Sequence, residues 1–121
     1  MQYKSMQYVD RPVSPFFYGV CGPRFGDGSQ QDELLESMFE LGINAFDCAR
    51  NYGLAEKSLG MWLKHNGHRD QCVILSKCGH HDVDTLKKRV SRQEMYDDLN
   101  ESQELLGIDK IDIYILHRDD E

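Results

Sequence analysis

Short apolar runs alternate with longer amphipathic stretches along this chain. Four runs have the length and composition of buried strands, and the three stretches between them carry apolar residues at helical spacing. The predicted strands are residues 16–21, 43–46, 72–76 and 111–116. The predicted helices cover approximately residues 29–41, 54–64 and 91–106. The hydrophobic pattern therefore predicts the element order β-α-β-α-β-α-β.

Local signals mark the ends of these helices. Ser91 and Glu94 form an S-x-x-E capping box, and Ser29 with Asp32 is a variant of it that predicts a helix start at Ser29. Glycines follow each helix, at positions 42, 67 and 107. Residues 22–28 contain three glycines and a proline and are predicted to be an irregular loop. Residues 1–13 are interpreted as an extended segment or a small hairpin.

Strands that are joined by single crossover helices are expected to pair in parallel, with right-handed connections. Two α/β architectures satisfy this order: a partial (β/α)₈ barrel, with about four parallel strands and three crossover helices, or a four-stranded doubly wound sheet. The first βα turn has glycines at 19, 22, 26 and 28, which is not the G-x-G-x-x-G spacing, and the sequence has no G-x-x-x-x-G-K-[ST] motif. This disfavours a nucleotide-binding doubly wound sheet. The length of 121 residues predicts one domain, residues 1–121.

Charge and cysteine usage restrict the partners and the location. The net charge of −7 disfavours binding to nucleic acid or to an anionic membrane. No apolar run has the length that a bilayer requires, and the first ten residues lack the apolar region of a signal peptide. The four cysteines have no C-x-x-C spacing, which favours free thiols in a reducing cytoplasm. We therefore expect a cytoplasmic protein.

Polar residues follow three of the predicted strands. Asp47 ends one strand, with Tyr52 five residues later, Lys77 ends the next, and His117 ends the last. Each residue alone has a plain structural explanation, as a helix cap, a packing residue, a surface charge or a core histidine. Because the carboxyl ends of parallel strands meet on one face, their joint placement predicts a candidate active site.

These four side chains suit carbonyl reduction. Free tyrosine titrates at about pH 10, so a neighbouring lysine ammonium is needed to make its phenol a useful proton donor. A carboxylate near the lysine holds that ammonium charged, and a histidine can donate a hydrogen bond that orients a substrate carbonyl. The remaining requirement is a hydride, which side chains cannot supply, so a nicotinamide cofactor is expected.

A metal site is the competing interpretation. Cys78, His80, His81 and His117, with Cys48 nearby in the pattern, are residue types that bind metals. They lack the two separated ligand pairs that are typical of structural zinc. We therefore expect no metal.

Four segments resemble the aldo-keto reductase family, in the family's order and over nearly the whole chain. NAFDCARNYGLAEKSLGMWL is similar to the family signature F-D-x-A-x-x-Y-G-x-[SA]-E-x-x-L-G, and VILSK is similar to its lysine strand. SRQEMYDDLNESQELLGIDKIDIYILHRDD resembles its helix-and-histidine segment, and FFYGVCGPRFG its first strand and loop. One departure is Cys48, where threonine is common.

The resemblance implies a (β/α)₈ barrel that reduces aldehydes or ketones with NADPH or NADH. It implies that Tyr52 is the general acid, that Lys77 activates it, and that His117 orients the carbonyl. Asp47 would pair with Lys77 and lie near the nicotinamide ribose. Gly22 and Pro23 fall where the family's first loop approaches the cofactor, a weaker match.

The family barrel needs about 250 residues, and this chain reaches only the fourth strand. We therefore expect an N-terminal half of a reductase, without most of the residues that hold the cofactor. The alternative function is a non-catalytic half-barrel module that pairs with another chain through its open sheet edges. Two further explanations of the open edges are two copies that pair to complete a barrel, and a decayed remnant that folds poorly. The substrate is expected to be a small carbonyl compound.

Overall fold

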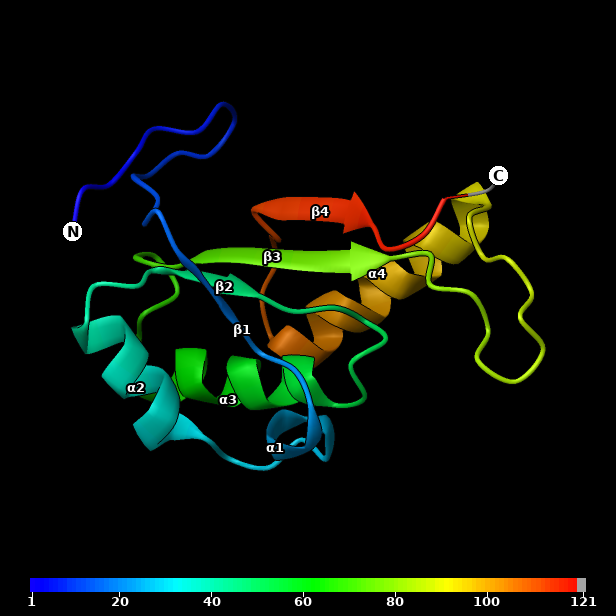
Figure 1. Cartoon of the computed structure of the whole chain (residues 1–121), viewed down its shortest axis with the longest axis horizontal. Coiled ribbons are helices and arrows are strands. Elements are labelled where there is room, and N and C mark those ends of the chain that lie inside the picture. The colour runs from blue at the N-terminus through cyan, green and yellow to red at the C-terminus, as the bar shows by residue number, and fades with distance from the viewer. Residues whose placement is uncertain (120–121) are drawn as a thin grey trace.

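The computed structural model describes residues 1–119, and Figure 1 shows their path from strand to helix and back. The elements, in chain order, are β1 (Phe17–Gly19), α1 (Pro23–Gly26), α2 (Asp32–Glu40), β2 (Ala45–Asp47), α3 (Ala55–Asn66), β3 (Val73–Cys78), α4 (Arg92–Leu106) and β4 (Ile113–Leu116). Among residues 1–119, no helix is both long enough and apolar enough to cross a membrane.

The four strands form one parallel sheet in the order β1-β2-β3-β4. The register places Gly19 beside Asp47, and Lys77 beside Ile115. The predicted parallel pairing is confirmed. All four strands differ from the prediction by one or two residues at one or both ends. An apolar run does not by itself mark where the ladder stops; Val20, for example, lies outside β1 although its amide still donates to the Asp47 carbonyl at 2.8 Å.

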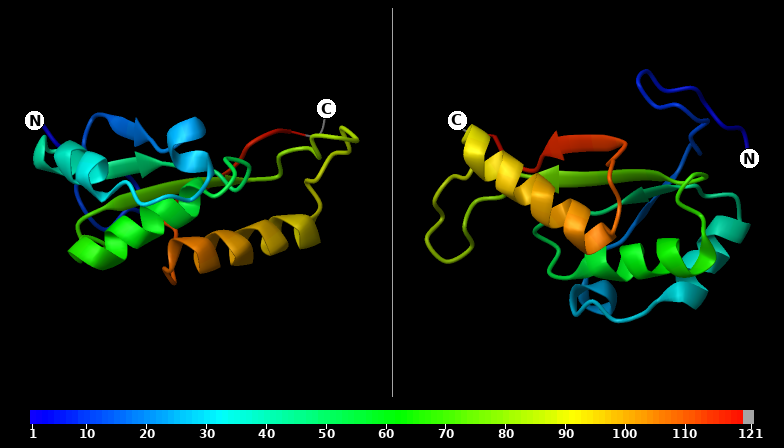
Figure 2. Two further views of the ribbon diagram at one scale, coloured as in Figure 1. Left: turned by 90° about the horizontal axis from the view of Figure 1, so that it is seen from below. Right: turned by 180° about the vertical axis from the view of Figure 1, so that it is seen from behind.

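The helices share one face of the sheet. A single core cluster contains buried residues from every helix together with Phe46 of β2 and Ile74 of β3. Figure 2 shows the same arrangement from below and from behind. A doubly wound sheet would have helices on both faces. Strand order that follows the chain, with helices on one side, is instead the arrangement of a (β/α)₈ barrel segment.

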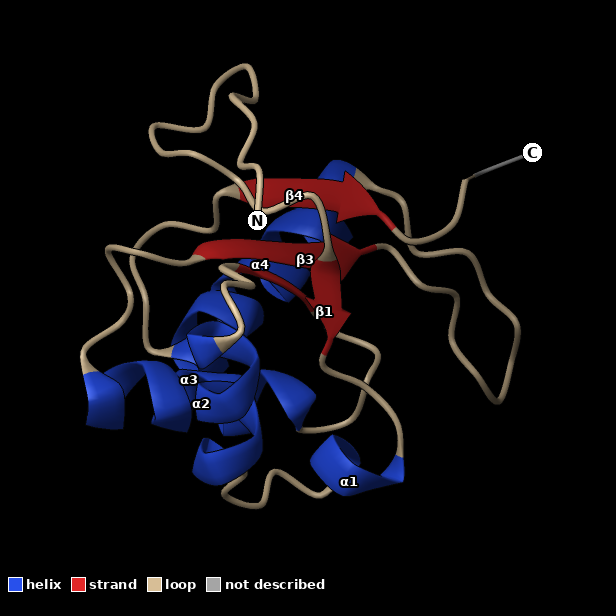
Figure 3. Ribbon diagram, turned by 60° about the vertical axis from the view of Figure 1, so that its left-hand side comes forward, coloured by secondary structure: helices blue, strands red, loops and turns tan. Residues whose placement is uncertain are grey.

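The N-terminal segment covers part of the opposite face. Lys4 and Val13 exchange backbone hydrogen bonds of 2.9 and 2.8 Å, which confirms the predicted small hairpin. Val13 is buried with Ala45 and Val73 in a second, smaller cluster. This hairpin lies near the amino ends of the strands, as Figure 3 shows, so it leaves the carboxyl ends free.

The prediction of an irregular loop at residues 22–28 was wrong in part, because residues 23–26 form the helix α1. Its single turn is closed by the Gly26 amide, which donates to the Gly22 carbonyl at 2.9 Å. Pro23 occupies the first helical position, where a missing N–H costs nothing and a fixed φ favours the turn. Proline here begins a helix instead of preventing one.

The predicted start of the second helix at Ser29 was also wrong. The helix α2 begins at Asp32, with Gln31 at the N-cap position. The Ser29 amide instead donates to the Asp27 carboxylate at 2.9 Å, so the serine belongs to the preceding turn. The Ser91–Glu94 capping box of α4 is confirmed with both of its hydrogen bonds, and Gly67 and Gly107 end their helices in the left-handed conformation.

The helices α3 and α4 approach closely at Gly60. A Cβ atom on this residue would lie 2.5 Å from the Leu106 carbonyl oxygen and 2.7 Å from that of Leu105. Both neighbours are backbone atoms, so the two helices would have to separate. Glycine at this position is therefore required by packing, although alanine favours a helix by about 1 kcal/mol.

We expect Gly60→Ala to lower the free energy of unfolding by about 1–3 kcal/mol, because overpacking exceeds the gain in helix propensity. Urea unfolding monitored by circular dichroism measures this change. Gly26→Ala is the matched control, because nothing lies within 4 Å of its added Cβ. Equal stability of the two variants would contradict the close helix contact.

Candidate active site

The four polar residues that the sequence singled out meet at the carboxyl edge of the sheet. Asp47 is the last residue of β2, Lys77 is the penultimate residue of β3, and His117 directly follows β4. Tyr52 lies in the loop between β2 and α3, residues 48–54, which we call the tyrosine loop. The Arg50 amide holds this loop to β3 by donating to the Lys77 carbonyl at 3.1 Å. The parallel strands thus gather these residues, as the alternation of strand and helix predicted.

The Lys77 ammonium lies at the centre of the cluster. It donates to the Asp47 carboxylate and to the Cys48 carbonyl oxygen, the latter at 2.9 Å, and it lies 3.4 Å from the Tyr52 hydroxyl. Burial disfavours the charged form of Lys77, but the hydrogen bond and the charge of Asp47 outweigh it, and the pKa of Lys77 is raised. The lysine is therefore a fixed positive charge beside the phenol.

His117 completes the group from the edge strand. Its ring lies edge-on to the Tyr52 ring, with 5.5 Å between the centroids and an interplanar angle of 89°. The Nδ1 atom of His117 is buried and has no hydrogen-bond partner among residues 1–119. Burial, followed by the charges of His80 and Lys77, lowers the pKa of His117. The imidazole is therefore neutral at neutral pH, when it has one N–H to donate.

Neutral His117 predicts a pH dependence of stability. The unfolded histidine takes up a proton near its ordinary pKa of 6.5, and the folded one resists it, so the unfolded state binds more protons below that pH. The free energy of unfolding is expected to fall as the pH is lowered through this window. Urea unfolding at a series of pH values measures the slope, and His117→Asn should reduce it. The same slope in both proteins would contradict the assignment of this pH dependence to His117.

Gly22 and Pro23 lie at the carboxyl end of β1, on the same edge of the sheet. Gly22 has a φ of 79° and nothing lies within 4 Å of where its Cβ would be, so a ligand could approach its backbone closely. The helix α1, which Pro23 begins, contacts the tyrosine loop, because the Leu54 amide donates to the Gly26 carbonyl at 2.9 Å. The first loop and the tyrosine loop therefore form one continuous rim.

The residues of the metal hypothesis do not form a ligand set. The His80 ring lies against the rings of His81 and His117, with centroids 4.3 and 4.8 Å apart, and the Cys78 sulfur faces the Ile115 carbonyl. Within residues 1–119, no group of three or more His, Cys, Asp or Glu side chains is arranged to hold a metal ion. Burial also raises the pKa of the Cys48 thiol to about 12.

Sequence reasoning missed several charged residues that support the site. Asp98 of α4 is buried; it accepts from the Gly79 amide at 2.9 Å and pairs with Arg89 at 2.7 Å, which holds the loop after Lys77. The buried carboxylate of Glu56 pairs at 2.8 Å with Arg50, a partly buried residue of the tyrosine loop. Glu56 is the glutamate of the family signature, and this was the one signal in the sequence that could have singled it out. The spacing of residues does not show that its carboxylate is buried. A pocket of about 320 Å³ opens beside Lys77 among these loops.

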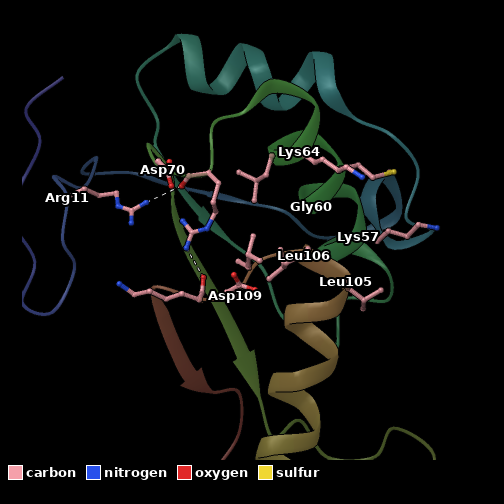
Figure 4. Close-up of a pocket in the computed structure, with 14 residues that line it drawn as sticks. Arg11, Lys57, Gly60, Lys64, Asp70, Leu105, Leu106 and Asp109 are labelled. Atoms are coloured by element: carbon pink, nitrogen blue, oxygen red, sulfur yellow. Dashed lines mark hydrogen bonds between the residues drawn. The ribbon is translucent and has the colours of Figure 1, made fainter.

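A larger pocket, of about 540 Å³, lies at the opposite end of the sheet. Figure 4 shows it between Gly60 of α3 and Leu106 at the end of α4, with Arg11 reaching in from the N-terminal segment. Both arginines of this pocket already bind protein groups. Arg69 donates to the Lys110 carbonyl at 2.7 Å and pairs with the buried carboxylate of Asp112, and Arg11 donates to the Cys72 carbonyl at 2.8 Å. This pocket is a structural junction, remote from the four residues at the carboxyl edge.

Comparison with known proteins identifies the family. A model of the aldo/keto reductase family matches residues 23–121. The chain is 33% identical over 99 residues to the L-glyceraldehyde 3-phosphate reductase of Escherichia coli K12, which covers 75% of this chain and 28% of that protein. It is 28% identical to the NADP(+) aldo-keto reductase yakc of Schizosaccharomyces pombe, over 84% of this chain and 31% of that protein.

Solved structures agree. A crystal structure of an aldo-keto reductase from Pseudomonas aeruginosa is 31% identical, with a TM-score of 0.77, over 97% of this chain and 47% of that one. The chain thus spans about half the length of this solved relative, and less than a third of the two curated relatives above. The family match and these neighbours agree with the strand order and the one-sided helices. The chain therefore belongs to the aldo/keto reductase family, and its four strands form part of that family's (β/α)₈ barrel.

Proposed function

We propose that this chain carries the catalytic residues of an NAD(P)H-dependent reductase of aldehydes or ketones and corresponds to its N-terminal half. The observation that supports this most is the position of the Lys77 ammonium between the Asp47 carboxylate and the Tyr52 hydroxyl. Electrostatic positioning of a proton donor is what carbonyl reduction requires of side chains. The family membership supports the same reaction.

The chain's own residues would act on the carbonyl oxygen. Tyr52 would donate its proton to that oxygen as negative charge develops there. Lys77, fixed by Asp47, would stabilise the phenolate that results. His117, which is neutral, would donate a hydrogen bond that orients the carbonyl. These are the roles that the family resemblance implies for the same residues.

A nicotinamide cofactor would supply the hydride when bound. The residues present fit its nicotinamide end, because Asp47 leaves 37% of its side-chain surface exposed beside Lys77, and Gly22 has open space around its α-carbon. We propose NADPH, or NADH, with Gly22, Pro23 and Asp47 near it. The name of the Schizosaccharomyces pombe relative includes NADP(+). Most of the contacts with the adenine end would come from the other half of the barrel.

We propose a small carbonyl compound as the substrate, and we propose no binding to nucleic acid or to a membrane. The acidic net charge of −7 supports the exclusion of nucleic acid and anionic lipid. All four cysteines are free thiols, and three of them are buried. Free thiols are typical of a reducing compartment, which supports a location in the cytoplasm.

Oxidation of NADPH in the presence of aldehydes and ketones, followed by absorbance, tests the proposal. The assay uses this chain and the full polypeptide encoded by its reading frame. We expect carbonyl-dependent oxidation in at least one of them, with the alcohol as product. Binding of NADPH without turnover of any carbonyl in both would contradict the proposal.

A second candidate is a non-catalytic half-barrel that pairs with another chain. It is supported by the edge strand β4, where Ile115 and Leu116 are 44% and 49% exposed. Unpaired apolar edges favour association with further strands. Size-exclusion mass together with quenching of NADPH fluorescence separates the two candidates. A chain that associates and does not quench supports the module, and quenching supports the reductase.

A further inference from the structure

A carboxylate is completely buried behind the tyrosine loop. Glu56, in the first turn of α3, has no exposed surface. Its Oε1 accepts a hydrogen bond of 2.6 Å from the Ser76 hydroxyl, and its Oε2 accepts one of 2.8 Å from Nη1 of Arg50. Ser76 immediately precedes Lys77 in β3, and alternation along a strand directs the two side chains to opposite faces of the sheet. Glu56 is therefore outside the catalytic cluster but joined to the strand that carries its lysine.

Arg50 connects this carboxylate to the loop that carries Tyr52. Its Nη2 donates to the Gly53 carbonyl oxygen at 2.7 Å, and its backbone amide donates to the Lys77 carbonyl at 3.1 Å. One arginine thus binds the chain on both sides of the tyrosine, at residues 50 and 53, and attaches it to β3. The planar fork of arginine fixes directions that a lysine or an apolar residue would not fix.

Stability alone does not explain this pair. Replacing both members of a buried ion pair by apolar residues of similar volume is often neutral or stabilising, because charges are costly to remove from water. The contribution that apolar residues could not reproduce is directional. The pair links the segment between residues 50 and 53 to Ser76 of β3 through hydrogen bonds of fixed direction.

We propose that Glu56 and Arg50 are a positioning pair for Tyr52. Glu56 holds the Arg50 guanidinium, and Arg50 holds the loop so that the phenol lies within reach of the Lys77 ammonium and edge-on to His117. The inference rests on the proposed function, because it names the residues that align the proposed proton donor. Neither residue touches the reacting atoms, so their effect passes through Tyr52.

Backbone bonds hold the loop at its two ends and within its turn. The Cys48 amide donates to the Leu75 carbonyl at 2.9 Å, and the Leu54 amide donates to the Gly26 carbonyl at 2.9 Å. These bonds hold the two ends of the loop to β3 and α1. Within the turn, the Tyr52 amide donates to the Ala49 carbonyl and the Ala55 amide donates to the Tyr52 carbonyl, both at 3.1 Å. The Arg50–Gly53 bond and the Glu56 contact add the side-chain restraint that joins this turn to β3.

The test is the contact between the Tyr52 and His117 rings, measured as a nuclear Overhauser cross-peak in the labelled 121-residue chain. The double variant Glu56→Met/Arg50→Met replaces the pair with apolar residues. We expect it to fold, with an unchanged or higher midpoint of thermal unfolding, and to lose the cross-peak. Glu101→Gln is the matched control, because Glu101 is an exposed carboxylate 3.7 Å from Arg50, and this variant should keep the cross-peak.

A cross-peak that persists in the folded double variant would overturn the inference, and so would its absence from the wild-type chain. If the double variant does not fold, Glu56→Gln, which removes the charge and keeps the shape, provides the same comparison. In that variant a weakened cross-peak supports the inference, and an unchanged one overturns it.

The ring contact is independent of turnover, so the two proposals fail separately. If the unmodified chain and the full polypeptide reduce no carbonyl while the double variant loses the cross-peak, the proposed function is overturned and the positioning pair is not. Carbonyl reduction by a double variant that keeps the cross-peak would overturn only the positioning pair.

Discussion

Replacing Tyr52 with phenylalanine is expected to lower kcat for carbonyl reduction by about 10²–10⁴-fold, the usual contribution of a general acid. The substitution removes the hydroxyl that lies 3.4 Å from the Lys77 ammonium and keeps the ring that packs against His117. The fold should therefore persist while the proton donor is lost. Steady-state kinetics on this chain, and on the full polypeptide encoded by its reading frame, measures the change.

The matched control is Tyr96→Phe, the same substitution at a tyrosine outside the cluster. Tyr96 is half exposed on α4 and does not belong to the cluster, so its loss of a hydroxyl should leave kcat unchanged. An unchanged kcat in Tyr52→Phe would rule out Tyr52 as the proton donor.

Replacing Lys77 with methionine is expected to reduce kcat strongly, with little change in the affinity for NADPH. Methionine approximates the length of the stem but removes the ammonium that faces the Tyr52 phenol, so the acid loses the charge that assists it. The Asp47 carboxylate would lose its ion-pair partner, but it is 37% exposed and water can solvate it. The variant should consequently fold.

Single-turnover rates and NADPH fluorescence titration together measure this second effect. Lys57→Met is the control, because this lysine lies on α3 beside the remote pocket. A large loss of NADPH affinity with normal turnover in Lys77→Met would show that the lysine binds the cofactor and does not assist the acid.

Much of this fold follows from hydrophobic periodicity. The apolar strands, the amphipathic stretches between them and the glycines at helix ends predicted the order of elements, and parallel pairing follows from single crossover helices. The gathering of Asp47, Lys77 and His117 on one edge follows in turn, because strand ends of one direction share an edge. The Ser91–Glu94 cap was predicted because its two hydrogen bonds are local in sequence.

The errors occurred where several local interactions compete. Ser29 has the residue type of a cap, but it belongs to a turn with Asp27, and the choice between the two depends on the path of the loop. The buried partners of the site were missed for a different reason. Glu56 and Arg50 are six residues apart and read as surface charges, and only the packing of α3 against β3 encloses them.

The central claim is that the phenol held beside Lys77 donates a proton as a hydride reaches the carbonyl carbon. Single-turnover reduction with NADPH deuterated at the transferable position tests it most directly, with wild-type protein and Tyr52→Phe compared by mass spectrometry of the alcohol. The account predicts that the wild-type product carries deuterium on the former carbonyl carbon and that the variant forms it at least about a hundredfold more slowly. Unlabelled alcohol, or equal rates in the two proteins, would contradict it.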